Sequence, residues 1–329
     1  MSRSGLRFFT NTDSNSHSMF RSLVFCLFGA SLTISRAETL TSPDGRLTAG
    51  ISVVGKRLSY SVSLDSRPMV ETSPLGFTLD GVDHGENVVI SSSADEKADE
   101  SFPSRHGVHA VGRNHYQGKR ITVTHKPSGI SHILHFRAYA SGIAFCYELD
   151  RRGARELTGE FSSFVLPKGS NVWWQKGTDV YENIYTSSDV AAIPADTRMG
   201  PPVVSRLADD AGFVAITQTA PQAGFPNPFL VKAKSGDAHG FQVAYPKNGD
   251  GSIGTSAKGG IRTPWNVVLV GKDLNALVNS DIVESLAPAP DRALFPEGAA
   301  TGWARPGRSV WDWMSRFPGG NTAENAKLN

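Results

Sequence analysis

Cysteine is scarce in this chain, which contains only two in 329 residues. Cys26 lies in an apolar segment near the N-terminus, and Cys146 lies in the apolar run 143–147. A framework of disulfide bonds is therefore excluded. A lone cysteine in a strand-like apolar run is typical of a buried structural thiol, so we do not expect Cys146 to be a nucleophile.

Sequence motifs of common nucleotide, hydrolase and zinc sites are also missing. The chain has no glycine-rich phosphate loop, no Gly-x-Ser-x-Gly sequence and no His/Cys cluster with zinc spacing. The closest histidines, His106, His109 and His115, lie in a polar segment, which disfavours a transition-metal site. Charge is balanced, with 33 Lys and Arg against 31 Asp and Glu and no basic block, so nucleic acid is not expected as a partner.

Long hydrophobic runs are limited to residues 23–30, which follow Arg21 and precede Ser35-Arg36-Ala37. A basic flank, a short apolar stretch and small residues at its end are typical of a cleaved secretory signal. We therefore expect residues 1–37 to be a signal peptide with an upstream extension, and the mature protein to be exported to the periplasm or the extracellular space. Because the run is too short to span a bilayer comfortably, no permanent membrane anchor is expected; a retained anchor is the alternative.

Helical periodicity is rare, whereas short runs of alternating or apolar residues recur along the chain. They predict strands over residues 47–53, 58–64, 76–79, 88–91, 121–125, 131–139, 142–149, 161–165, 212–217, 229–231, 240–244 and 265–270. Gly, Pro, Asp and Asn between the runs favour an all-β sandwich or large barrel over βαβ units. The Ser/Asp/Glu/Lys-rich residues 91–100 are predicted to be an exposed loop, and one short helix is predicted after Asp273.

The composition changes near residues 287–290, where Ala and Pro alternate, and 296–302 are small and turn-rich. This pattern is typical of a linker. We expect a β domain over residues 38–295 and, over 296–329, the truncated start of a second domain. A strand ending near Trp313 and a helix capped by Thr322 would be the first unit of that domain.

Two segments could contact a sugar. Residues 173–185 interleave Trp173, Trp174 and Tyr181 with Asp and Glu, and aromatic rings pack on the flat C–H faces of sugars while carboxylates bind hydroxyls. Packing of these rings in the core is the alternative. The second segment places an acid between two aromatics, Trp311-Asp312-Trp313, and direct substrate contact or a domain interface would both explain it.

In its order of motifs the chain resembles glycoside hydrolase family 97, a family of α-glucosidases and α-galactosidases. The motifs are Ser42-Pro43-Asp44-Gly45-Arg46-Leu47, Ser73-Pro74-Leu75-Gly76, Phe136-Arg137-Ala138-Tyr139, Gly142-Ile143-Ala144-Phe145, Tyr181-Glu182, Thr263-Pro264-Trp265, Pro306-Gly307, Trp311-Asp312-Trp313, Gly319-Gly320-Asn321-Thr322 and Glu324-Asn325. The resemblance implies an N-terminal β-super-sandwich, similar to galactose mutarotase, followed by the start of a catalytic (β/α)8 barrel.

The same resemblance implies an α-glucosidase-like enzyme whose substrates are oligosaccharides with α-linked glucose or galactose. It makes Glu182 a calcium ligand beside the barrel mouth and Tyr181, Trp311, Asp312 and Trp313 candidates for substrate contact. The family's catalytic carboxylates would lie beyond Asn329, in the remainder of the barrel, so no catalytic residue is assigned to this chain.

Two departures from the family pattern are Cys146, where arginine is usual, and Ser141, where aspartate is usual. One carboxylate cannot hold Ca²⁺, which takes about six to eight oxygen ligands, so we expect negligible calcium affinity from this chain alone. Two other hypotheses remain open: a non-catalytic carbohydrate-binding module that uses Trp173, Trp174 and Tyr181, and a purely structural β-sandwich.

Overall fold

The structure is a computed structural model, and it describes residues 36–104, 107–149, 155–177, 183–219, 225–233, 239–247, 252–256, 260–298, 301–303, 305 and 307–308. All of them belong to the unit Ser35–Asn329. The predicted signal segment up to residue 35 and the end of the chain from residue 309 lie outside the described residues.

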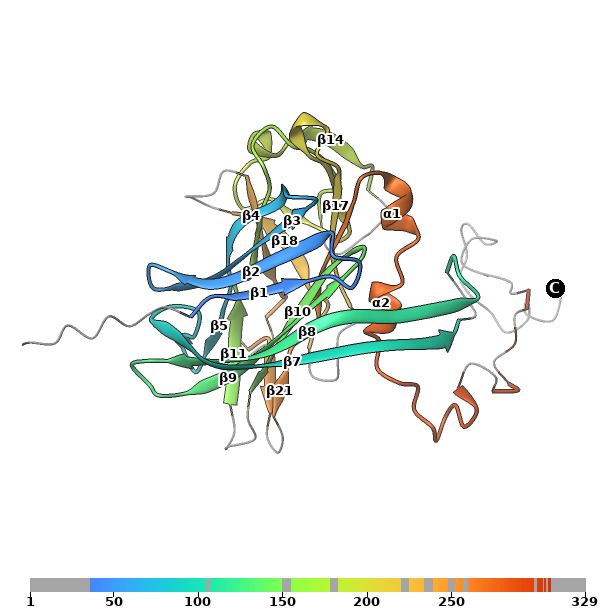
Figure 1. Cartoon of the computed structure of the whole chain (residues 1–329), viewed down its shortest axis with the longest axis horizontal. Coiled ribbons are helices and arrows are strands. Elements are labelled where there is room, and N and C mark those ends of the chain that lie inside the picture. The colour runs from blue at the N-terminus through green and yellow to red at the C-terminus, as the bar shows by residue number, and fades with distance from the viewer. Residues whose placement is uncertain are drawn as a thin grey trace, which may run out of the picture. The chain divides into compact units, whose positions relative to one another are not determined.

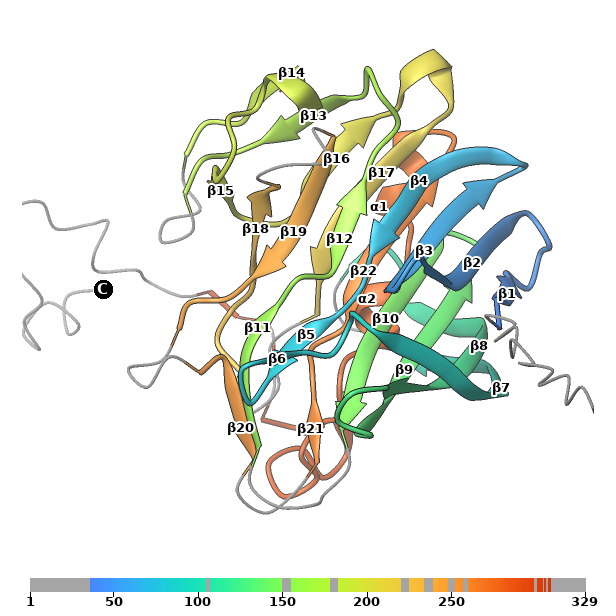
Figure 2. The same ribbon diagram turned by 90° about the vertical axis from the view of Figure 1, so that its left-hand side faces the viewer.

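The largest sheet is built from antiparallel neighbours and curves through the whole unit (Figures 1 and 2). Its strands, in spatial order, are β14 (Thr186–Asp189), β13 (Asn171–Trp174), β16 (Val203–Arg206), β17 (Phe213–Gln218), β22 (Asn266–Gly271), β10 (Gly142–Leu149), β9 (Ser131–Tyr139), β8 (Val111–His125) and β7 (Val88–Pro103), and β21 (Ile261–Arg262) also pairs with β10.

Three four-stranded sheets accompany it among the described residues. They are β1 (Glu38–Thr41), β2 (Leu47–Val54), β3 (Arg57–Leu64) and β4 (Arg67–Pro74); β20 (Gly254–Ser256), β11 (Arg155–Glu160), β5 (Phe77–Leu79) and β6 (Val82–Asp83); and β12 (Ser163–Val165), β19 (Gly240–Ala244), β18 (Phe229–Lys232) and β15 (Arg198–Met199). The helices are short: α1 (Leu274–Val278), α2 (Ile282–Ser285) and the 3-10 turns Val190–Ala192 and Ala208–Asp210.

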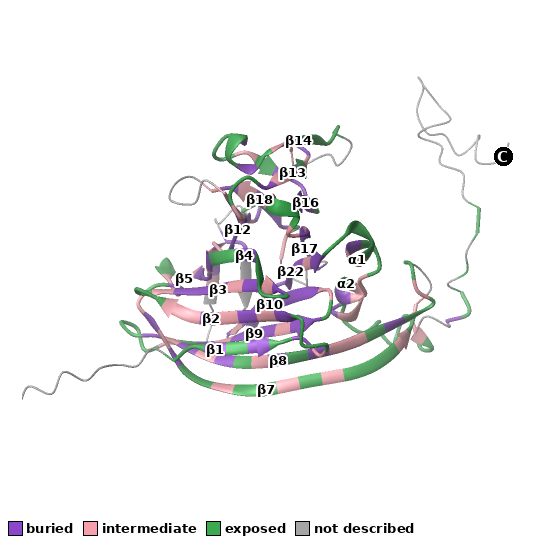
Figure 3. Cartoon of the chain, turned by 45° about the horizontal axis from the view of Figure 1, so that its top comes forward, coloured by how far each residue is buried: buried purple, intermediate pink, exposed green. Residues whose placement is uncertain are grey.

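One hydrophobic core receives side chains from all four sheets. On β10, alternation sends Ile143, Phe145 and Tyr147 into this core, where the Phe145 ring lies 5.3 Å from that of Tyr60 on β3. Figure 3 shows buried residues concentrated where β1–β3 face the central strands, whereas β7 is exposed along most of its length. The all-β super-sandwich predicted from the sequence is confirmed.

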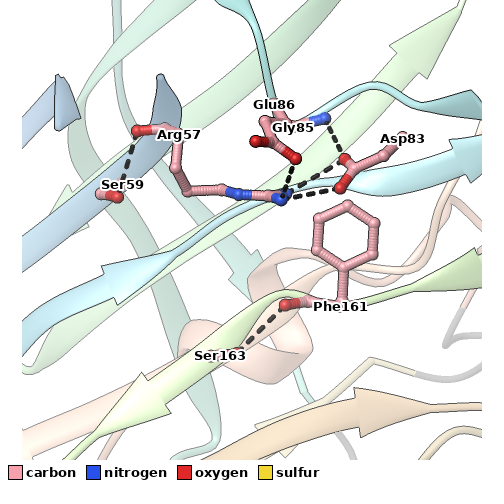
Figure 4. A network of polar contacts seen from close by, with 7 residues as sticks. All are labelled: Arg57, Ser59, Asp83, Gly85, Glu86, Phe161 and Ser163. Carbon is pink, nitrogen blue, oxygen red and sulfur yellow. Dashed lines mark hydrogen bonds and ion pairs between the residues drawn. The ribbon is translucent and has the colours of Figure 1, made fainter. Parts of the chain in front are cut away.

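A charged clamp joins β3 to the β6 turn (Figure 4). Arg57 forms a two-pronged contact with Asp83, at 3.0 and 2.7 Å, and also reaches Glu86 at 3.3 Å. Its guanidinium carbon lies 4.9 Å from the centre of the Phe161 ring. Gly76 packs against this ring, with which a Cβ would collide, and Gly85 packs against Gly76 and the Arg57 guanidinium. The clamp therefore holds three segments together that are far apart in sequence.

The strand predictions for 131–139, 142–149 and 240–244 match β9, β10 and β19. The predicted exposed loop at 91–100 is wrong, because these residues belong to the 16-residue strand β7. They pair with β8 over the length of the hairpin, and this backbone pairing outweighs the loop-like composition. The predicted helix after Asp273 is confirmed as α1, and the Asp273 side chain accepts a hydrogen bond from the Ala276 amide at its N-terminus.

Candidate functional site

The residues singled out for substrate and metal binding lie in two segments that the structure does not describe. Tyr181 and Glu182 fall in residues 178–182, and Trp311, Asp312 and Trp313 fall in residues 309–329. The structure does describe the two strands that precede and follow residues 178–182 in the sequence. These strands, β13 and β14, pair as a hairpin at one edge of the large sheet (Figure 2).

The inner face of this hairpin is anchored in the core. Val172 is fully buried, and Trp174 packs against the same core while its indole Nε1 donates to Ser188 Oγ across the hairpin at 3.2 Å. Strand alternation therefore turns Trp174 inward and Trp173 outward. The use of Trp174 as a sugar contact, one part of the carbohydrate-binding hypothesis, does not fit this packing.

The residues on either side of 178–182 are held by hydrogen bonds. Before this segment, Lys176 and Gly177 bridge to Met199, and the Gly177 backbone amide donates to the Arg198 carbonyl at 3.0 Å. After it, the side-chain Nδ2 of Asn183 donates to the Lys176 carbonyl at 2.8 Å. Gly177 has a φ of +103°, which only glycine adopts readily, so the chain can turn sharply where the segment begins. Gly177 and Asn183, the described residues on either side of 178–182, are thus fixed at the sheet edge.

Large apolar side chains are exposed beside this segment. Trp173, Tyr185 and Ile184 are 38%, 46% and 88% exposed. On β14, Ser187 lies directly opposite Trp173, and its hydroxyl donates to the Asn171 amide oxygen. Flat rings next to hydroxyl and amide groups suit a sugar, or a protein surface that covers the rings.

A second cluster lies on the opposite face of the large sheet from the core. The Arg137 guanidinium carbon lies 4.1 Å from the ring centre of Tyr116 and 4.6 Å from that of Trp265, and Arg262 lies 5.4 Å from Trp265. Arg137 also forms an ion pair with Glu96 at 3.2 Å. Both rings of this stack are buried, and the two arginines are partly buried beside them.

The same face holds Cys146, His135 and Tyr139. Burial raises the pKa of the Cys146 thiol to about 12, so the thiol stays protonated and unreactive, as a structural role requires. Burial lowers the pKa of His135 even though Glu148 contacts its Nε2 at 2.8 Å. Arg137 of β9 and Arg262 of β21 place cations on this face near Cys146.

No metal site can be built from the described residues, which contain no group of three or more His, Cys, Asp or Glu side chains able to hold an ion. Glu182 is not among them, so calcium binding stays a prediction. Among the same residues, no helix is long and apolar enough to cross a membrane.

Comparison with known proteins identifies the class of this sandwich. The family model described as Glycosyl-hydrolase 97 N-terminal matches residues 40–288, which is most of the chain. The solved structure of a Glycoside Hydrolase Family 97 enzyme from Pseudoalteromonas sp. strain K8 has the same fold, with a TM-score of 0.70 at 21% identity over 78% of this chain and 39% of that one. The chain belongs to the glycosyl-hydrolase 97 N-terminal family.

Two curated relatives are similar in sequence. A retaining alpha-galactosidase of Bacteroides thetaiotaomicron is 28% identical, with 89% of this chain and 46% of that protein covered. A probable retaining alpha-galactosidase of Streptomyces bingchenggensis is 25% identical, with 86% and 41% covered. The chain therefore spans less than half the length of these relatives.

Proposed function

We propose that this chain is the N-terminal portion of an exported glycoside hydrolase, which packs on a catalytic (β/α)8 barrel and supplies part of the sugar site. The match to the family model over residues 40–288 carries this proposal. Residues 296–329 begin the barrel in this account, and the remainder of the barrel supplies the carboxylates that cleave the glycosidic bond.

The site is completed at the interface of the two parts. Glu182 contributes a calcium ligand from residues 178–182, and Tyr181, Trp311, Asp312 and Trp313 contact the substrate. The hydrogen bonds of Gly177 and Asn183, on either side of residues 178–182, support this assignment, because a metal ligand donated across a domain interface must be held in a fixed position.

The substrate proposed is an oligosaccharide that ends in α-linked galactose or glucose. Both curated relatives are named as α-galactosidases, and a solved relative from Pseudoalteromonas sp. strain K8 was studied in complex with panose and acarbose. We expect the galactoside to be the better substrate, because the relatives with the higher sequence identity carry that name.

The test is made on the complete natural polypeptide, with Glu182→Gln compared with wild type. Calcium affinity measured by calorimetry and hydrolysis of aryl α-galactosides should both fall by about tenfold or more, because one charged ligand is lost. Glu71→Gln, at an exposed position on β4, is the matched control and should change neither. Unchanged calcium affinity in Glu182→Gln would refute the assignment.

A second candidate function is carbohydrate binding without catalysis, and the exposure of Trp173 and Tyr185 favours it. Titration of the purified chain with galactose and glucose oligosaccharides, followed by tryptophan fluorescence, separates the two. A saturable change that Trp173→Ala abolishes supports the binding module, and no change leaves the hydrolase domain as the better account.

A further inference from the structure

Glu160, at the end of β11, is a carboxyl group enclosed in the core where three sheets meet. Its side chain is 4% exposed. Oε1 accepts a hydrogen bond from Asn266 Nδ2 of β22 at 2.7 Å, and Oε2 accepts one from the Tyr245 hydroxyl, just after β19, at 3.1 Å. One carboxyl thus connects the β11 and β19 sheets to the large sheet.

Two amide side chains extend this contact. Gln218 of β17 is the direct cross-strand partner of Asn266, and both point to the core side of the large sheet, as Ile216 and Val268 do. Asn266 is fully buried and Gln218 is 8% exposed. Asn266 Oδ1 and both amide atoms of Gln218 have no hydrogen-bond partner among the described residues, and each such buried group costs about 1–3 kcal/mol.

Among the described residues, the side chains that act on the Glu160 carboxyl are the neutral groups Ser162, Asn266 and Tyr245. Within the described part of the chain, the titratable groups that interact electrostatically with Glu160 are Tyr147 of β10 and Tyr245. Burial raises the pKa of both well above the ordinary tyrosine value. Both therefore stay neutral. Burial also raises the pKa of Glu160 to about 7, although hydrogen bonds from Ser162, Asn266 and Tyr245 oppose the shift. The carboxyl consequently changes charge close to neutral pH.

We infer that Glu160, Asn266 and Gln218 form a two-state hydrogen-bond switch that responds to pH. In the ionised state Asn266 Nδ2 donates to the carboxylate, as in the structure, and Gln218 Nε2, which makes no hydrogen bond among the described residues, turns to donate to Asn266 Oδ1. When Glu160 takes up one proton, its O–H donates to Asn266 Oδ1 after a half-turn of that amide. Asn266 Nδ2 then donates to Gln218 Oε1 after a matching half-turn of the Gln218 amide. A half-turn exchanges the amide oxygen and nitrogen with almost no change in shape, so the packed core admits both states.

The switch is placed where it can affect the neighbouring strand ends. Thr219 follows Gln218 and Trp265 precedes Asn266, and these two residues are joined by the Thr219 amide donating to the Trp265 carbonyl at 3.0 Å. The Trp265 amide donates in return to Thr219 Oγ1 at 3.1 Å. Trp265 carries the stack with Arg137 on the other face. A change in amide orientation thus reaches both faces of the large sheet, independently of any hydrolase activity.

The test is an NMR titration of the chain from about pH 5 to pH 9, following the Glu160 carboxyl carbon and the side-chain amides of Asn266 and Gln218. We expect all three to shift with one midpoint near pH 7, close to the pKa of about 7. Gln218→Met identifies the Gln218 resonance by its loss and should move the midpoint of the other two.

Glu160→Gln keeps the shape of the side chain and removes its titration, so the amide resonances should become independent of pH. Glu148→Gln, which alters an acid on the other face, should leave the titration unchanged. A Glu160 carboxyl that titrates near its ordinary value of 4.5 would overturn the switch, and so would amide resonances that do not follow it. If a variant does not fold, the titration of the wild-type chain is by itself sufficient to test the switch.

Discussion

The guanidinium carbon of Arg137 lies 4.6 Å from the centre of the Trp265 indole. The two residues come from β9 and from the segment just before β22, and the ring centre of Tyr116 on β8 lies 4.1 Å from the same guanidinium carbon. This contact ties neighbouring strands together on the face of the sheet that the main core does not reach.

Removing this cation should weaken the fold. Arg137→Ala loses contacts with two rings and leaves Glu96 without its ion-pair partner, so we expect the free energy of unfolding to fall by about 2 kcal/mol in urea denaturation. Arg113→Ala is the control, because its contact with Asp99 is exposed at the protein surface, and it should be neutral. Equal effects of the two variants would contradict the role given to the stack.

His132 should make the fold sensitive to acid. It is fully buried beside Phe77 and Tyr147, and burial lowers its pKa to about 3. The unfolded chain takes up a proton below about pH 6.5, whereas the folded one does not, so stability present above that pH is lost as the pH falls towards 3. We expect the contribution of His132 to have a slope approaching about 1.4 kcal/mol per pH unit, measured in urea denaturation as the difference between wild type and a variant without this imidazole.

The variant His132→Phe should flatten that slope, since the phenyl ring fits among aromatic neighbours and does not titrate. His115→Gln, on a more exposed part of β8, should keep the wild-type slope. If His132→Phe loses stability in acid as steeply as wild type does, groups other than His132 cause the loss.

Glu160 should make the folded state less stable as the pH rises, which is opposite to the effect of His132. Its pKa is raised by burial from 4.5 to about 7, so the stability present below pH 4.5 is lost as the pH rises through 7. Because His132 contributes equally to both proteins, urea denaturation should show wild type losing about 3 kcal/mol relative to Glu160→Gln between these limits. Identical profiles for the two proteins would show that the carboxyl is ionised in the folded state throughout this range.

Replacing each of the two tryptophans of β13 by alanine should reduce the free energy of unfolding by clearly different amounts. Trp174→Ala removes a ring packed on the core and should cost about 2–3 kcal/mol, whereas Trp173→Ala removes an exposed ring and should cost about 0.5 kcal/mol or less. Thermal and urea unfolding measure both. A larger loss for Trp173 than for Trp174 would mean that the hairpin faces the other way.

Continuous apolar runs predicted the central strands well, because residues such as Phe145 and Cys146 face two different buried layers and both are apolar. Composition failed for residues 91–100, whose charged side chains point to solvent from a strand that β8 holds by backbone pairing. The short strands β13 and β14 went unpredicted, since four residues are too few to show a period.

The candidate site was predicted only as separate segments. Family resemblance pointed to Tyr181 and Glu182. The contacts that hold the chain on either side of residues 178–182 involve Met199 and Asn183, which no local pattern singles out. The contact of Glu160 with Asn266 joins residues 106 positions apart, and only the fold brings them together. Such long-range polar contacts leave no periodic trace in a sequence.

The central claim is that this chain supplies one part of a hydrolase site whose catalytic carboxylates lie elsewhere. The most direct test is an assay of the purified chain, with calcium present, for release of a chromophore from aryl α-galactosides and α-glucosides. We predict release no faster than in buffer alone. Release that rises in proportion to the concentration of the purified chain would contradict the account.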